Sequence, residues 1–280
     1  MPNRIEFTIA DLSVALHWQS QFGAVNLPRA FLPFQSSGES SIRLELSTED
    51  PKPEEGVPTF DTSPIWSLHR VNGGLSFRLF EGYPDLQRRL FIPDEGADAR
   101  LTFLAQNRNP FVGPSLELLT ITQLARRGGA ILHGCGISID GRGIVFAGES
   151  GAGKSTLSRL WAQAQGIEIL SDDRVIVRRQ NGALRLYGTP WHGDEAFAAP
   201  GGVELSRIFF IRHGPRNQVQ ELTAGQAVAA MLQCSFPPLW DAGGMAAALE
   251  LFHAMAVAAP CAELGFVPDQ RVIDFVRCCL

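Results

Sequence analysis

Alternating apolar and polar residues mark the first third of the chain. The segments that alternate as half-buried strands do are Ile5–Ile9, Ser41–Leu46 and Leu75–Phe80. Clusters of turn-forming residues separate them at Gln35–Ser40, Glu49–Pro58 and Asn72–Gly74. The pattern predicts a small antiparallel β-rich domain or elaboration over residues 1–112, for which scaffolding, substrate docking and oligomerisation are all open roles.

From residue 113 the pattern changes, because apolar runs now alternate with helical periodicity. Helices are predicted over Pro114–Arg127, Lys154–Gln165, Thr223–Cys234, Gly243–Val257 and Val272–Cys278. Strands are predicted over Ala130–Leu132, Gly136–Ile139, Ile144–Ala147, Ile167–Leu170, Val175–Arg179 and Arg207–Ile211. The chain is therefore predicted to be an α/β protein, with a core domain over residues 113–280 behind the β-rich leader.

Composition narrows the class of protein. Hydrophobic residues make up 45% and charged residues 19%, which is ordinary for a folded globular chain. The net charge of -5 argues against nucleic acid as a partner, since such proteins usually carry a basic face. The N-terminus lacks a secretory signal, and the most apolar stretch, Met245–Pro260, contains Glu250 and His253 and is too short for a membrane span. A cytoplasmic protein without a membrane partner is expected.

Cysteine spacing does not suggest a metal site. The five cysteines form no CxxC pair and no Cys/His cluster with zinc spacing. The adjacent Cys278 and Cys279 are open to a redox or lipidation role, although two ordinary thiols on a terminal helix are favoured.

One segment carries a phosphate-binding pattern, GxxxxGK[ST]. Its residues are Gly148, Glu149, Ser150, Gly151, Ala152, Gly153, Lys154, Ser155 and Thr156. The pattern alone is common, but here it follows a predicted buried strand and opens a predicted helix, as the binding of phosphate by backbone N–H groups and a helix N-terminus requires. Lys154 is expected to reach the β- and γ-phosphates of a nucleotide, and the Ser155 hydroxyl to bind Mg²⁺.

A pair of carboxylates follows one helix later. Asp172 and Asp173 come directly after the strand Ile167–Leu170, and two strands joined by a helix run parallel. Their ends lie on one edge, so the aspartates are expected near the bound phosphates. One would hold Mg²⁺, with Asp172 the candidate, and the other would accept a proton, with Asp173 the better candidate. A surface turn is the alternative interpretation.

Two further groups are candidates for the site. His133 precedes the strand that leads into the phosphate-binding loop and is expected beside the γ-phosphate, although a structural histidine is the commoner role. Trp191 and His192 lie in a connecting segment rich in turn formers, where substrate contacts and an ordinary rigid turn are equally open.

Taken together, these motifs resemble the HPr kinase/phosphorylase family and its relatives in the ATP-dependent phosphoenolpyruvate carboxykinase group. The residues that carry the resemblance lie in Leu132–Gly134, Gly143–Thr156 and Leu170–Val175. The resemblance is good over residues 130 to 180 and thin elsewhere. Thr156 stands where the family usually has Glu, and Gly188–Gly193 replaces a glycine-rich segment linked to phosphorylase activity, so the chain looks closer to HPr kinase-related proteins found beside peptide-tailoring enzymes.

The resemblance implies a nucleotide-binding core of that family's type, with ATP and Mg²⁺ handled by Lys154 and Ser155. It implies that Asp172 and Asp173 supply the metal contact and the base, that His133 assists, and that the chain self-associates. The acceptor it implies is a serine of a small protein or peptide. A metabolite hydroxyl and a non-catalytic ATP-binding sensor remain alternatives, and carboxykinase chemistry is disfavoured because no second basic, metal-binding cluster is evident.

Overall fold

The computed structural model describes residues 3–48, 57–79, 87–96, 98–104, 106 and 108–280. Contacts within the chain divide it into two compact units, Met1–Thr120 and Ile121–Leu280. The helix α1 (Ser115–Ala125) crosses this division. The assignment of separate roles to residues 1–112 and 113–280 stays a prediction.

The first unit is built on one eight-stranded sheet. Its strands are β1 (Asn3–Ile9), β2 (Leu12–Trp18), β3 (Ile42–Ser47), β4 (Phe60–Asp61), β5 (Trp66–Val71), β6 (Gly74–Leu79), β7 (Arg88–Pro93) and β8 (Asp98–Phe103), in the order β1-β2-β3-β8-β7-β6-β5-β4. The three predicted strands correspond to β1, β3 and β6, while Phe80 and residues 49–56 of the predicted loop lie outside the described residues. The prediction of an antiparallel sheet is wrong at its centre, because β3 pairs parallel with both β2 and β8.

The second unit contains a mixed sheet. Its strands are β9 (Gly129–Ile139), β10 (Arg142–Ala147), β11 (Ile167–Ser171), β12 (Arg174–Gln180), β13 (Ala183–Tyr187), β14 (Gly202–His213), β15 (Gln218–Glu221) and β16 (Cys261–Phe266). The order is β10-β9-β12-β13-β14-β16-β15, and β14 also pairs parallel with β10. Five strands therefore form a closed circuit, β10-β9-β12-β13-β14. The chain is a mixed α/β protein with a β-rich N-terminal sheet, and its assignment to the HPr kinase type of core stays a prediction.

The long strand β9 corrects the sequence prediction of two short strands. The break predicted near Gly134 is absent because Gly134 and Gly136 permit close packing: a Cβ on Gly136 would lie 2.6 Å from Val175 Cγ1. β9 pairs antiparallel with β10, β11 and β12. Since β10 and β11 are both antiparallel to β9, they run in the same direction, as predicted, but β9 lies between them.

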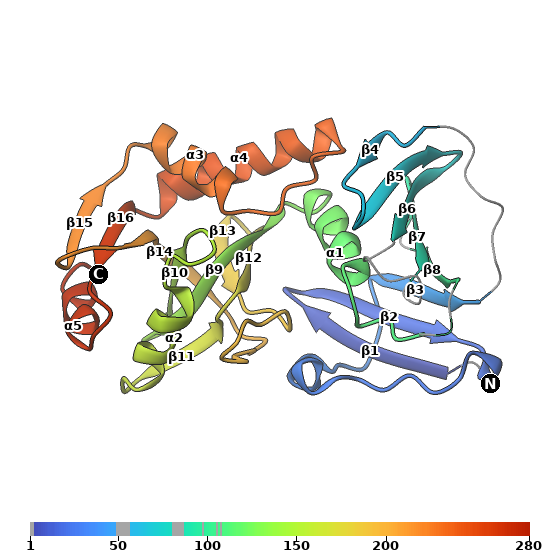
Figure 1. The fold of residues 1–280 in the computed structure, drawn as a ribbon, viewed down its shortest axis with the longest axis horizontal. Helices are drawn as coiled ribbons and strands as arrows, with labels where there is room; N and C mark the ends of the chain where they lie inside the picture. The colour runs from blue at the N-terminus through green and yellow to red at the C-terminus, as the bar shows by residue number, and fades with distance from the viewer. Residues whose placement is uncertain (1–2, 49–56, 80–86, 97, 105, 107) are drawn as a thin grey trace. The chain divides into compact units, whose positions relative to one another are not determined.

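Helices cover both faces of this sheet (Figure 1). The helices α3 (Ala224–Gln233) and α4 (Ala242–Ala258) pack on one hydrophobic cluster, which includes Met231, Phe252 and Met255. The helices α2 (Lys154–Ala162) and α5 (Arg271–Arg277) contribute Leu157, Trp161 and Val276 to a second cluster. In the part of the chain that the structure describes, no helix combines the length and the apolar character that a membrane crossing needs.

An aromatic stack ties the central strands to α2. The ring of Phe146 on β10 lies parallel to that of Phe209 on β14, with centroids 5.6 Å apart, and stacks on Trp161 of α2 at 5.9 Å. All three side chains are fully buried. The strand before the phosphate-binding loop and the helix after it are thus held on the same core.

We expect Phe209→Ala to destabilise the protein by about 3–5 kcal/mol, because a buried ring in a packed stack is replaced by a cavity. Urea unfolding followed by circular dichroism would measure the change. Leu239→Ala, at an exposed position, is the control and should change the free energy of unfolding by less than about 0.5 kcal/mol. A similar small effect for Phe209→Ala would contradict the role of the stack.

Candidate active site

Strand pairing brings the predicted site residues to one edge of the second sheet. Ala147, at the end of β10, lies opposite Gly134 of β9, and Arg174, at the start of β12, lies opposite His133. The N–H of Gly134 donates to the main-chain oxygen of Asp173 at 2.8 Å. The predicted phosphate-binding loop (Gly148–Thr156, called the phosphate-binding loop below), His133 and the aspartate pair therefore meet where these strands end.

The phosphate-binding loop has the backbone conformation that its glycines allow. Gly151 and Gly153 have φ values of +84° and +102°, in the region that side chains rarely adopt. A Cβ on Gly148 would lie 2.9 Å from Ala152 Cβ. Within the described residues no side chain caps the start of α2, so its first-turn N–H groups remain available to an anion. The loop fits a phosphate chain.

Lys154 lies across this loop. Its Nζ donates to the carbonyl oxygens of Gly148 and Glu149, each at 2.9 Å, and the side chain is buried. Burial lowers the pKa of Lys154, and the negative charge of Asp173 opposes that shift. The ammonium group is thus held beside the phosphate-binding loop. If a bound phosphate replaced the two carbonyl oxygens as the acceptor, its negative charge would offset the cost of burying the ammonium group.

The donor set fits Mg²⁺ only together with a phosphate ligand. Among the described residues no group of three His, Cys, Asp or Glu side chains could hold a metal ion. Ser155, in the first turn of α2, is partly exposed. Mg²⁺ commonly binds through one or two protein oxygens, substrate phosphates and water, and a hydroxyl at this position suits that mode. Thr156 follows it in the same turn.

Asp173 is the centre of a charged cluster. Its Oδ1 lies 3.1 Å from Nε2 of His133, and its Oδ2 accepts a hydrogen bond from Arg174 at 2.7 Å. The carboxylate side chain retains 22% exposure. Burial raises the pKa of Asp173, but the hydrogen bond from His133 and the positive charge of Arg174 outweigh it and leave the pKa below its usual value. Asp173 is therefore a fixed, ionised and accessible carboxylate.

Phe236 completes this cluster and was not among the residues predicted from the sequence. Arg174 packs over its ring at 5.2 Å, and the ring of His133 lies 6.1 Å away. The segment that contains Phe236 is positioned by a hydrogen bond, in which the N–H of His133 donates to the carbonyl oxygen of Cys234 at 2.7 Å. No local motif marks Phe236, since it reaches the site through backbone contacts of residues 234–236 with residues 131–133.

Asp172 differs sharply from its neighbour. It is 1% exposed, and its two oxygens accept hydrogen bonds from the N–H groups of Gly193 at 3.0 Å and Glu195 at 2.9 Å. The observed role of Asp172 is to anchor the loop 188–195. Metal contact through Asp172 would require these oxygens to be shared or released, and it stays a prediction.

The loop 188–195 is held on two sides of the site. Glu195 forms an ion pair with Arg159 of α2 at 3.1 Å, and the hydroxyl of Thr189 donates to the carbonyl oxygen of Arg174 at 2.7 Å. Trp191 and His192 are both half-buried in this loop, and His192 Nδ1 lies 2.8 Å from the oxygen of Gly193. The structure therefore places the two predicted substrate contacts on a segment tied to Asp172 and α2. Their contact with a substrate stays a prediction.

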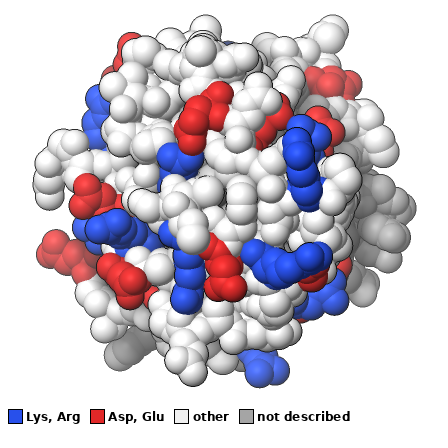
Figure 2. Space-filling model, turned by 90° about the vertical axis from the view of Figure 1, so that its left-hand side faces the viewer, with Lys and Arg blue, Asp and Glu red and all other residues white. Residues whose placement is uncertain are grey.

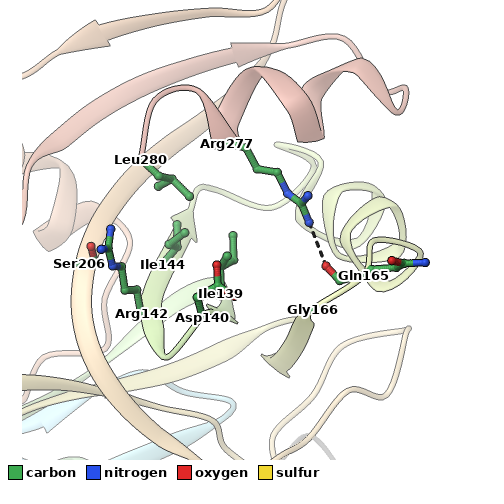
Figure 3. A pocket seen from close by; sticks show the side chains of 9 residues that line it. All are labelled: Ile139, Asp140, Arg142, Ile144, Gln165, Gly166, Ser206, Arg277 and Leu280. Carbon is green, nitrogen blue, oxygen red and sulfur yellow. Dashed lines mark hydrogen bonds between the residues drawn. The ribbon is translucent and has the colours of Figure 1, made fainter.

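A cavity of about 510 Å³ lies at the opposite end of β10 and is separate from this site (Figure 3). Arg142, where β10 begins, lines it, whereas the phosphate-binding loop follows the last residue of that strand. Arg277 lines it from α5 and donates to the oxygen of Gln165 at 2.9 Å. Acidic and basic side chains are interspersed on the face shown in Figure 2.

Comparisons with known proteins give partial matches. No family model matches the chain. The shikimate kinase of Rhizobium meliloti (strain 1021) is 40% identical over 76 residues, which are 27% of this chain and 38% of the length of that relative. The HPr(Ser) kinase/phosphatase from Coxiella burnetii is 15% identical, with a TM-score of 0.32 over 52% of this chain and 93% of that chain. The sequence match relates part of this chain to part of a kinase, and a TM-score of this size does not establish a shared fold.

We expect Asp172→Ala to destabilise the protein by about 3 kcal/mol, because two partly buried N–H groups lose their acceptor. Urea unfolding would measure the loss, and amide hydrogen exchange at Gly193 and Glu195 should become faster. Asp194→Ala removes an exposed acid from the same loop and should cost less than about 0.5 kcal/mol. Equal effects of the two variants would contradict the anchoring role.

The lowered pKa of Asp173 predicts a pH-dependent contribution to stability. Because its pKa is lower in the folded than in the unfolded chain, the ionised form favours folding. That contribution is complete above the unfolded value of about 4 and is lost as the pH falls through the folded pKa. The difference in free energy of unfolding between the wild type and Asp173→Asn should shrink as the pH falls below about 4. A pH-independent difference would be the contrary result.

Proposed function

We propose that this chain is an ATP-dependent kinase that transfers the γ-phosphoryl group to the hydroxyl of a serine in a small protein or peptide. The observation that carries the proposal is the placement of an ionised, partly exposed Asp173 at the same sheet edge as the phosphate-binding loop. A carboxylate there would repel a bare phosphate chain. The presence of the Asp173 carboxylate at this edge is explained if a cation shields the phosphates and the carboxylate accepts a proton during the reaction.

The residues of the site would have separate roles in phosphoryl transfer. The loop amides and Lys154 would bind the β- and γ-phosphates, and Ser155 would hold Mg²⁺. ATP supplies the phosphoryl group, and Mg²⁺ neutralises charge on its oxygens when both are bound. Asp173 would accept the proton of the attacking hydroxyl as the new oxygen–phosphorus bond forms and the bond to ADP breaks. Positioning and charge neutralisation would supply most of the rate enhancement.

The low pKa of Asp173 suits this reaction. A loose transition state for phosphoryl transfer needs little proton removal before the phosphorus–oxygen bond to the leaving group breaks. The carboxylate can therefore orient the hydroxyl and take its proton late. His133 and Arg174 would act as positioning residues, because each holds one oxygen of Asp173.

A second acceptor class has its own support. The match to shikimate kinase relates part of the chain to an enzyme named for a small-molecule substrate, and it favours a metabolite hydroxyl as the alternative acceptor. The peptide acceptor is supported by the motif resemblance and by the half-buried Trp191 and His192, which would contact it. A non-catalytic sensor that binds ATP is the third possibility and is separated from both by the experiment below.

We expect transfer of label from γ-labelled ATP with Mg²⁺ into a small protein or peptide in an extract of the source organism. Lys154→Ala should abolish both transfer and ATP binding. Asp173→Asn should bind ATP within a few-fold of the wild type but transfer about 10²–10⁴-fold more slowly, because the base is lost. Asp274→Asn, an exposed acid on α5, is the matched control and should behave as the wild type.

The outcomes separate the candidate functions. Label in a low-molecular-weight product would select the metabolite kinase. ATP binding without turnover would select the sensor, and full transfer by Asp173→Asn would rule out Asp173 as the base. Absence of ATP binding by the wild type would overturn the proposal as a whole.

A further inference from the structure

The phosphate-binding loop has two different flanks. On one side of β10 lies β9, which carries His133 and leads to Asp173. On the other side lies β14, parallel to β10, and beyond it β16, parallel to β14. The ends of these three parallel strands lie at the same edge of the sheet. The proposed base is on the first flank only.

This asymmetry gives a bound nucleotide a direction. The inference rests on the proposed function, in which the acceptor hydroxyl lies beside Asp173 and attacks the γ-phosphate opposite the leaving oxygen. The β- and α-phosphates and the nucleoside must then extend away from Asp173. That direction leads across the loop toward the end of β14.

His213 is the last residue of β14 and lies directly against the loop. A Cβ on Gly153 would be 2.9 Å from Cε1 and 3.1 Å from Nε2 of His213. The imidazole is exposed, and beside it lies Phe266, which is fully buried, with ring centroids 5.2 Å apart and an angle of 32° between the ring planes. A side chain at Gly153 would therefore meet both rings, with Phe266 Cζ at 2.7 Å, and would also be disfavoured by the φ value of +102°.

Backbone contacts hold this pair of rings in place. His213 and Phe266 are partners in the pairing of β14 with β16, and the N–H of Gly214 donates to the oxygen of Phe266 at 3.0 Å. Asn217 accepts a hydrogen bond from the N–H of Val267 at 2.8 Å, which joins the two connections that follow the strands. An exposed flat ring on a fixed backing suits stacking with a nucleobase.

We propose that His213 forms the nucleobase seat of this site, with Phe266 as its support. The imidazole lies at the loop glycine that precedes Lys154, so the triphosphate and the base would be bound by adjoining surfaces. The role is one of nucleotide binding and positioning, and His213 takes no part in the transfer of the proton or the phosphoryl group.

The test compares ATP with inorganic tripolyphosphate, which has the phosphate chain but no nucleoside. Calorimetric titration with Mg²⁺ present should show that His213→Ala weakens ATP binding roughly tenfold, since one stacked base contributes about that factor. Tripolyphosphate binding should change less than about twofold, because the loop is intact, and this also shows that the variant is folded. His213→Phe keeps an aromatic face and should bind ATP nearly as the wild type does.

His253→Ala removes an exposed histidine from α4 and is the matched control. Unchanged ATP affinity in His213→Ala would overturn this inference and leave the kinase proposal standing. Equal weakening of ATP and tripolyphosphate would also overturn it, because His213 would then act on the phosphates. Weak ATP binding in both His213 variants, with tripolyphosphate binding unchanged, would show that His213 binds the nucleoside by hydrogen bonding, and it would overturn the proposed stacking. A wild type that binds neither ligand would overturn the proposed function and this inference together.

Discussion

The pairing of β9 with three other strands is the constraint on which the site depends. One stretch of β9 contacts β10, which leads into the phosphate-binding loop, and the other contacts β12, which begins beside Asp173. His133 is the last residue of the stretch that pairs with β12, and Gly134 begins the stretch that pairs with β10. A register shift of one residue would turn every side chain of β9 to the opposite face, so the core and the site require the same register. The glycines of β9 allow that register, since Gly134 and Gly136 leave room for the strands around them.

Two adjacent carboxylates acquire different chemistry from this arrangement. Asp172 is buried and accepts hydrogen bonds from two backbone N–H groups of the loop 188–195, so it maintains that loop. Asp173 keeps exposure to the site and is held ionised by His133 and Arg174. The division follows from burial and hydrogen bonding, because the side-chain chemistry of the two residues is identical. Arg174 is in turn backed by Phe236, which extends the cluster into a segment remote in sequence.

The same sheet edge would fix the orientation of the bound nucleotide in the proposed reaction. Asp173 and its partners occupy the β9 side of the phosphate-binding loop, while His213 and Phe266 occupy the β14 side. A nucleotide bound between them would present its γ-phosphate to the base and its nucleoside to the aromatic pair. The loop 188–195, tied to α2 through Arg159 and Glu195, provides a third boundary of the site.

The sequence by itself determined the mixed α/β class, the β-rich leader, most helices and the glycine-rich turn from strand to helix at Gly148–Thr156, because each rests on local periodicity or on glycines at fixed spacing. It also predicted correctly that β10 and β11 run in the same direction, although β9 lies between them. Only the tertiary structure decided that β9 is one strand, that β3 pairs parallel with its neighbours, and that Asp172 and Asp173 differ in burial. Phe236 and His213 likewise became candidates only through contacts across long separations in the chain. The physical reason is that hydrophobic patterns report which side of an element is buried, whereas strand partners and register depend on packing between segments that the local pattern does not relate.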